Sequence, residues 1–172
     1  MRINKSDKTA NDAYIKHIIF NGILLWNNTK INITGGSVIA EGDLAIQGNG
    51  SRDNTEINIS GENTIITGKD AAIYHPQGGK LNISGGTITG STGIVVKGGE
   101  VTISGGTING TGEAVAYAPV SSGYQGTGDA LYVEHYDNSQ NSENYGTPTV
   151  TVTGGTFNST NAHPIASYAN PN

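Results

Sequence analysis

The sequence of 172 residues contains no cysteine, only five prolines and few charged residues. Without cysteine, the chain can form neither a disulfide framework nor a Cys-based zinc or redox site. Charged residues make up 13% of the chain and apolar residues 34%, and both shares are low for a globular protein. Low hydrophobicity is typical of disordered chains, but these usually carry a high net charge, whereas this chain carries −5. The composition therefore indicates a fold that builds its core economically.

Further absences limit the expected partners. Nine basic residues stand against 14 acidic ones, so no basic stripe is present to neutralise phosphates, and we expect no nucleic acid. No apolar run reaches the length of about 18 residues that a membrane-spanning helix requires, so we expect no membrane insertion. The first 14 residues, MRINKSDKTANDAY, are polar where a signal peptide is apolar. If Met1 is the natural start, the sequence predicts no export by a signal peptide.

Glycine, in contrast, is abundant, and many of the 26 glycines belong to a repeat. Five segments share the pattern apolar–polar–apolar–Ser/Thr–Gly, and their starts lie 26, 24, 20 and 49 residues apart. They are INITGGSVI from Ile31, INISGENTII from Ile57, LNISGGTI from Leu81, VTISGGTI from Val101 and VTVTGGTF from Val150. The alternation has period 2, and β-branched residues dominate, so each segment is predicted to be a strand. The longest interval also contains the strand-like DALYVE at 129–134.

Alignment of the repeats predicts four columns of inward-facing apolar residues. The first two columns are Ile31, Ile57, Leu81, Val101 and Val150, then Ile33, Ile59, Ile83, Ile103 and Val152. The third, beyond the glycines, is Val38, Ile65, Ile88, Ile108 and Phe157, and the fourth is Ile46, Ile73, Ile94, Leu131 and Ile165. Such stacking explains how few apolar residues suffice, because each repeat satisfies its backbone hydrogen bonds on its neighbours.

The predicted fold class is all-β, a single-stranded right-handed parallel β-helix of about five coils with an N-terminal cap. Residues 1–30 are predicted to be the cap or an anchoring segment, either helical or irregular, because short apolar runs do not distinguish these. Residues 31–172 form the β-helix, with insertions within 110–148. A β-sandwich is the alternative, but its strands would need hairpin turn signals that the repeat does not show.

The ISGGT-type corners and the TGDAL segment carry a family resemblance. The residues are Ile83 to Thr87, Ile103 to Thr107, Thr127 to Leu131 and Val152 to Thr156. This repeat resembles those of adhesin-like surface proteins of Gram-positive bacteria and of virion proteins of phages (fibre, decoration or spike proteins). More distantly, it resembles the pectate-lyase-like superfamily. The resemblance covers residues 31–168 and implies a β-helix displayed outside the cell.

Two groups of residues are candidate binding surfaces. Five of the eight tyrosines fall in the irregular region and could stack on sugar rings or on a protein partner; they are Tyr117, Tyr124, Tyr132, Tyr136 and Tyr145. The alternative role for these rings is to hold the insertions against the solenoid wall. A polar outer face is predicted at Asn32, Asn58, Asn82, Thr102 and Thr151, where amides and hydroxyls either bind sugars or simply suit exposed parallel strands.

Catalysis is the less favoured interpretation. A hydrolase needs two carboxylates held about 5–10 Å apart over one groove. The nearest approach to such a pair is Asp129, Glu134 and Asp137, with His135 between them. We therefore expect no catalytic residues, no metal site and no cofactor.

The sequence favours a non-enzymatic structural or adhesion module on a phage virion, with a glycan-binding face. The alternatives are a bacterial cell-surface adhesin or carbohydrate-binding module, and a polysaccharide lyase or hydrolase. The expected location is the virion or the extracellular surface. The expected partners are virion or cell-surface scaffold proteins, with glycans and a second copy of the chain as further candidates.

Overall fold

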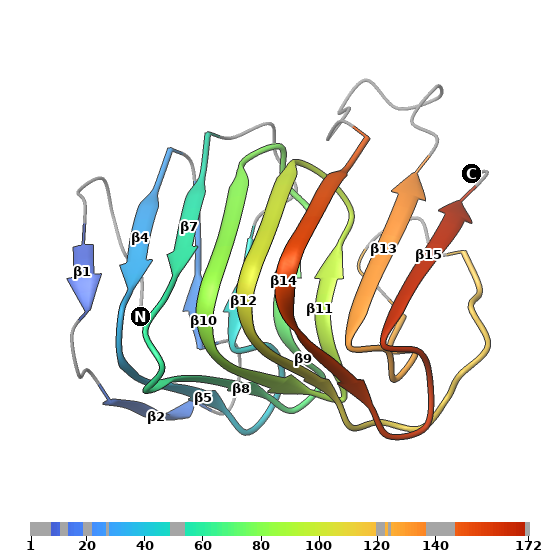
Figure 1. Cartoon of the computed structure of the whole chain (residues 1–172), viewed down its shortest axis with the longest axis horizontal. Coiled ribbons are helices and arrows are strands. Elements are labelled where there is room, and N and C mark those ends of the chain that lie inside the picture. Colours follow the sequence, from blue (N-terminus) through green and yellow to red (C-terminus); the bar gives the residue numbers. More distant parts are fainter. Residues whose placement is uncertain are drawn as a thin grey trace.

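The computed structural model describes residues 8–10, 14–18, 22–26, 28–48, 54–119, 123, 125–136 and 147–170. This part of the chain is all-β: its strands form two parallel sheets, and it contains no helix that could span a membrane. The strands follow one another along the long axis, from the blue N-terminal strands to the red C-terminal ones (Figure 1). The all-β prediction is confirmed at this level.

The larger sheet has nine strands. They are β1 (Lys8–Ala10), β2 (Tyr14–Ile18), β4 (Lys30–Ile33), β5 (Gly36–Ala40), β7 (Glu56–Ile59), β8 (Thr64–Gly68), β10 (Lys80–Gly90), β12 (Glu100–Gly110) and β14 (Thr149–Ser159). Strand β10 pairs with β7 along its first part and with β8 along its second part. The sheet therefore has a first arm (β1, β4, β7 and the first parts of β10, β12 and β14) and a second arm (β2, β5, β8 and the remaining parts).

The Gly-Gly pairs of the repeat lie where the two arms meet. The ladder shifts register there, since Ser84 pairs with Gly105 instead of Ser104. Gly86 and Gly106 have φ angles of 89° and 88°, a left-handed conformation that side chains with a Cβ rarely adopt. Glycine at these positions is what allows one continuous strand to bend from the first arm into the second.

The smaller sheet has six strands. They are β3 (Ile23–Leu24), β6 (Ile46–Gln47), β9 (Ala71–His75), β11 (Thr92–Val96), β13 (Leu131–Tyr136) and β15 (Ile165–Asn170). Their spatial order is their sequence order, because each pairs in parallel with the next one along the chain. The chain thus returns to this sheet after each passage through the larger one.

The predicted first, second and fourth columns are confirmed by the strand register. Ile57 pairs with Leu81, Ile59 with Ile83, and Ile73 with Ile94. These side chains are at most 1% exposed and belong to one continuous core. In the last repeat, Val152 and Ile165 are 41% and 49% exposed, because no further strand covers them in the described structure.

The third column is wrong at one position. Ile66, and not Ile65, pairs with Ile88 and is fully buried, whereas Ile65 is 43% exposed. The reason is the turn at Glu62 and Asn63, which makes the corner of this repeat two residues longer than the Gly-Gly corners. The inward residue of this repeat is therefore Ile66, and the predicted column was displaced from it by one residue, which is enough to exchange the two faces of a strand and put Ile65 on the outer face.

The segment predicted as a cap contributes strands in register with the first repeat. β1 pairs with β4, β2 with β5 and β3 with β6, all in parallel. Its described residues are therefore neither helical nor irregular where they form these strands. Trp26, which follows β3, is 52% exposed. A boundary near residue 30 stays a prediction.

A polar side chain, that of His75, lies inside the core at the end of β9. His75 is fully buried and pairs in register with Val96 of β11. Burial lowers the pKa of His75 from its ordinary 6.5 to about 4, because the interior disfavours the charged imidazolium. His75 is therefore neutral in the folded protein at neutral pH.

This depressed pKa predicts a loss of stability in acid. Between pH 6.5 and pH 4 the unfolded chain binds a proton at His75 that the folded chain does not, so the free energy of unfolding falls as pH falls. We expect this residue to contribute a loss of about 3 kcal/mol across that window. Urea titrations at several pH values should show a shallower pH dependence for His75→Leu. Equal slopes for His75→Leu and the unmodified chain would contradict the assignment.

Candidate functional site

The connection from β12 to β13 lies against the outer face of the smaller sheet. Alternation along β13 places Leu131 and Val133 in the core and Tyr132 on the opposite face. That face carries a second apolar cluster of Leu44, Ala71, Tyr74, Val95 and Tyr132, against which Tyr117 and Tyr168 pack. This outer cluster is buried because the connection covers it.

A buried ion pair holds the connection in place. Lys97 and Glu134 have side chains that are 7% and 0% exposed, and Lys97 Nζ lies 3.3 Å from Glu134 Oε2. Glu134 also accepts hydrogen bonds from the hydroxyls of Tyr132 and of Tyr117, the latter at 3.3 Å. Lys97 Nζ and the Tyr74 hydroxyl both donate to the carbonyl of Gly123, at 2.8 Å and 3.0 Å. The sheet and the connection are thus joined through charged and aromatic groups.

The electrostatics of this cluster favour neutral phenols around one carboxylate. Burial, reinforced by the charge of Glu134, raises the pKa of Tyr117 to about 12. The same causes raise the pKa of Tyr132 further. Burial lowers the pKa of Lys97, and the adjacent Glu134 carboxylate opposes that shift. The tyrosines therefore act as hydrogen-bond donors and have no tendency to ionise near neutral pH.

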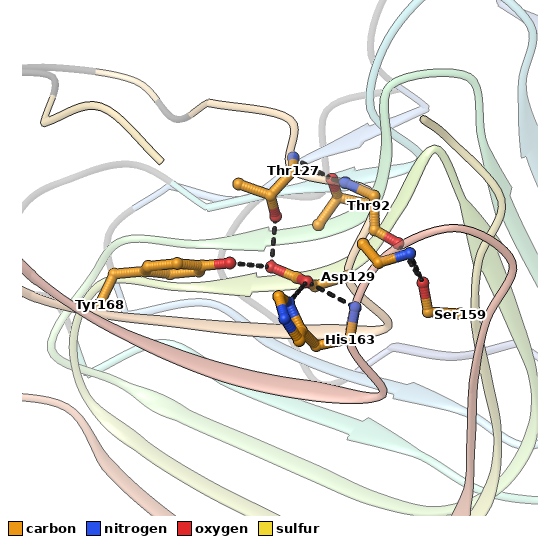
Figure 2. A network of polar contacts seen from close by, with 8 residues as sticks. Thr92, Thr127, Asp129, Ser159, His163 and Tyr168 are labelled. Atoms are coloured by element: carbon orange, nitrogen blue, oxygen red, sulfur yellow. Dashed lines mark hydrogen bonds and ion pairs between the residues drawn. The ribbon is translucent and has the colours of Figure 1, made fainter. Parts of the chain in front are cut away.

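A second network is centred on Asp129, which is fully buried (Figure 2). Its carboxylate accepts hydrogen bonds from the Thr127 hydroxyl, from the Tyr168 hydroxyl at 2.7 Å and from the backbone N–H of His163 at 3.0 Å. The Nδ1 atom of His163 lies 3.1 Å from the same carboxylate, while its side chain is 71% exposed. Ser159 closes the network by donating to the carbonyl of Gly128. Asp129 therefore joins the connection to β15 and to the loop that precedes it.

The rings of this region stack on one another. Tyr117 and Tyr168 are parallel with ring centroids 4.5 Å apart, and Tyr132 lies 5.0 Å from Tyr168. Of the tyrosines predicted as a binding surface, Tyr132 has no exposed surface and Tyr117 is half-buried. Tyr136 ends β13, but its side chain lies outside the described residues, as do Tyr124 and Tyr145. A glycan-stacking role for these residues stays a prediction, and the described contacts are those of anchoring residues.

The predicted polar outer face lies on the first arm. Its five positions are in register, as aligned from the sequence. Asn82 donates to Asn58, and Asn58 donates to Asn32, both at 2.8 Å, whereas Thr102 and Thr151 are exposed. The neighbouring column is charged and holds the ion pairs Lys30–Glu56 at 3.2 Å and Lys80–Glu100 at 3.5 Å. Many polar and charged groups on the outer side of the first arm therefore bond to neighbouring groups of the same arm.

Two of the acidic residues considered for catalysis lie in the interior of the protein. Asp129 and Glu134 are buried in separate networks with full sets of partners, and His135 is exposed. Asp137 lies outside the described residues.

A shallow hollow of about 340 Å³ is lined by Asp43, Asp70, Ser91 and Gly126. Burial, then the charge of Asp70, raises the pKa of Asp43. No cluster of three or more potential metal-ligating His, Asp or Glu residues occurs in the described part of the chain.

Lys97, His163 and Tyr168 are the residues that the sequence analysis missed. The signal for them was present in the fourth column, which aligns Ile94, Leu131 and Ile165. Counting three residues onward from each aligns Lys97, Glu134 and Tyr168. Counting two residues back from Leu131 and Ile165 likewise brings Asp129 next to His163. Polar residues at equal offsets in neighbouring repeats were therefore predictable contacts.

Comparisons with protein-family models, with curated proteins and with solved structures find no match to this chain. The class of protein that the observations define is thus an all-β protein of two parallel sheets built from a sequence repeat. The resemblance of the repeat to surface and virion proteins stays a prediction.

Proposed function

We propose that the chain is a right-handed parallel β-helix that serves as a non-enzymatic structural and adhesion module. The winding is supported by the parallel pairing of each strand with its equivalent one repeat later. Right-handed winding follows from the near-universal handedness of parallel crossover connections. In this interpretation, β1, β2 and β3 begin the solenoid, and the connection from β12 to β13 departs from its repeat.

The observation that carries the non-enzymatic assignment is that the carboxylates of Asp129 and Glu134 are buried and hydrogen-bonded within the protein. A catalytic carboxylate must reach its substrate, but both of these are fully buried and accept hydrogen bonds from tyrosine hydroxyls. Their contacts fasten the connection and the last strand to the solenoid wall. Asp129 and Glu134 therefore support a rigid surface, which is what an adhesive protein requires.

We propose further that the module is displayed on a phage virion as a fibre, decoration or spike protein. The support is the resemblance of the ISGGT-type repeat to such proteins, which is shared with bacterial surface adhesins. Labelling with an antibody raised against the chain, viewed by electron microscopy, separates the two locations. Label on particles is the expected result, and label confined to bacterial cell walls would favour the cell-surface adhesin.

The adhesive role predicts glycan binding without cleavage. The purified chain should retain at least one polysaccharide on a glycan array that includes host and bacterial cell-wall glycans. Incubation with the retained polysaccharide should release neither unsaturated nor reducing ends. Retention on no glycan would contradict the binding role. Product release that is lost in Asp129→Asn or in Asp43→Asn would replace the proposal with that of a polysaccharide-degrading enzyme.

A further inference from the structure

The second arm of the larger sheet presents an outer face that no motif in the sequence singled out. Its inward residues are Val38, Ile66, Ile88, Ile108 and Phe157, so the residues on either side of each point outward. We call these ten residues the second-arm face. They are Ser37, Ile65, Thr87, Thr107 and Thr156 in one column, and Ile39, Thr67, Thr89, Asn109 and Asn158 in the other.

The second-arm face differs from the other two outer faces of the described structure. The first-arm face contains the column of Lys30, Glu56, Lys80 and Glu100. The outer face of the smaller sheet is covered in part by the connection from β12 to β13. None of the ten second-arm residues is charged, and each is half-buried or exposed. Strands β5 and β8, which begin this face, lie along one side of the molecule (Figure 1).

The second-arm face is also a regular array. Successive outward residues of one strand lie about 6.7 Å apart, and neighbouring parallel strands lie about 4.8 Å apart. Each threonine hydroxyl can both donate and accept a hydrogen bond. Asn109 donates to the Thr89 hydroxyl at 3.1 Å and Asn158 donates to Asn109 at 3.0 Å, which orients these groups before any ligand arrives. Ile65, at 43% exposure, and the threonine methyl groups supply apolar contacts between the polar ones.

We infer that the second-arm face binds a neutral linear polysaccharide, an inference that rests on the proposed adhesive function and names its ligand class and its site. Sugar hydroxyls both donate and accept, so they match threonine hydroxyls and asparagine amides. The C–H faces of pyranose rings match Ile65 and the threonine methyls. A polymer of identical monomers meets the same groups at each strand, and this repetition adds many weak contacts. The absence of charge favours a neutral polymer, since a binder of an acidic polymer would carry cations.

The test replaces the uncharged array with the charge pattern of the first arm. In Thr87→Lys with Thr107→Glu, the two new side chains are register partners on β10 and β12, as Lys80 and Glu100 already are. The matched control, Lys80→Glu with Glu100→Lys, reverses the ion pair already present on the first arm of the same two strands. Circular dichroism and thermal unfolding should be the same for both variants. A third variant, Thr87→Ser with Thr107→Ser, keeps the hydroxyls.

Retention should be measured on insoluble cellulose and chitin as neutral probes and on immobilised polygalacturonate as the acidic probe. We expect the unmodified chain to bind a neutral probe more tightly than polygalacturonate. We expect the second-arm charge variant to lose at least tenfold in affinity, while the first-arm control and the serine variant stay within about threefold of the unmodified chain.

Equal losses in the two charge variants, or a preference for polygalacturonate, would overturn the inference. Binding to other array glycans that survives the second-arm charge variant would overturn the assigned site and leave the adhesive function standing. Binding of the unmodified chain to no glycan at all would overturn both.

Discussion

Replacing Glu134 with glutamine should lower the free energy of unfolding by about 3–5 kcal/mol, the range found when one partner of a buried ion pair is removed. The substitution keeps the shape of the side chain but removes the charge opposite Lys97, whose ammonium lies 3.3 Å away in a site that is 7% exposed. It also weakens the charge-assisted hydrogen bonds from Tyr132 and Tyr117. The connection from β12 to β13 should loosen first, because its contact with the sheet depends on this cluster.

Urea unfolding followed by circular dichroism measures the change, and the chain supplies a matched control. Lys80 and Glu100 form an ion pair between the same two residue types, but this pair lies on the surface, with side chains 61% and 67% exposed. Glu100→Gln should cost less than about 1 kcal/mol, since exposed ion pairs contribute little. Equal effects of the two substitutions would show that the Glu134 site is not buried as described.

Alanine at Ile66 should destabilise the protein by about 2–5 kcal/mol, whereas alanine at the adjacent Ile65 should cost less than about 1 kcal/mol. Ile66 is fully buried between Val38 and Ile88. Truncation leaves a cavity that cannot readily collapse, because β8 is hydrogen-bonded to β5 on one side and to β10 on the other. Ile65 is 43% exposed on the outer face. The two substitutions remove the same atoms from neighbouring positions, and so they differ in burial alone.

Denaturant midpoints and slopes for the two isoleucine variants, measured side by side, test the strand register directly. A larger loss at Ile65 would mean that β8 faces the other way, because a shift of one residue exchanges the two faces of a strand. The same result would remove Thr67 and Ile65 from the second-arm face. The experiment therefore also checks the geometry on which the inferred polysaccharide site depends.

Most of the core was predictable because contacts in a repeat occur at a constant offset. Once Ile57, Leu81 and Val101 are aligned, the register of their strands follows without knowledge of the three-dimensional structure. The prediction was wrong at Ile65, where the Glu62–Asn63 turn changes the length of the corner. Alternation specifies which residues share a face, but the length of a turn decides which face that is.

The candidate site was predictable in part. The alignment of the fourth column also brings Lys97 beside Glu134 and Asp129 beside His163. The prediction used only the apolar residues of that alignment and therefore missed these contacts. The inward packing of Tyr117 and the contacts of Gly123 were not predictable, because the connection that carries them has no counterpart in the other repeats. A segment without a repeat has no offset from which its neighbours can be derived.

The sequence by itself determined the all-β class, the parallel alignment of its repeats and three of the four core columns. It did so because a hydrophobic pattern of period 2, repeated at nearly regular intervals, can bury its apolar residues only on its own copies. Tertiary structure alone decided which outer faces remain open. The absence of cysteine and the small number of charged residues indicated a chain with few crosslinks or ion pairs to stabilise it. In the structure, the few charges that matter most, on Asp129, Glu134 and Lys97, are buried where they fasten the irregular connection to the wall. Their effect depends on the low-dielectric surroundings that packing creates, which composition does not report.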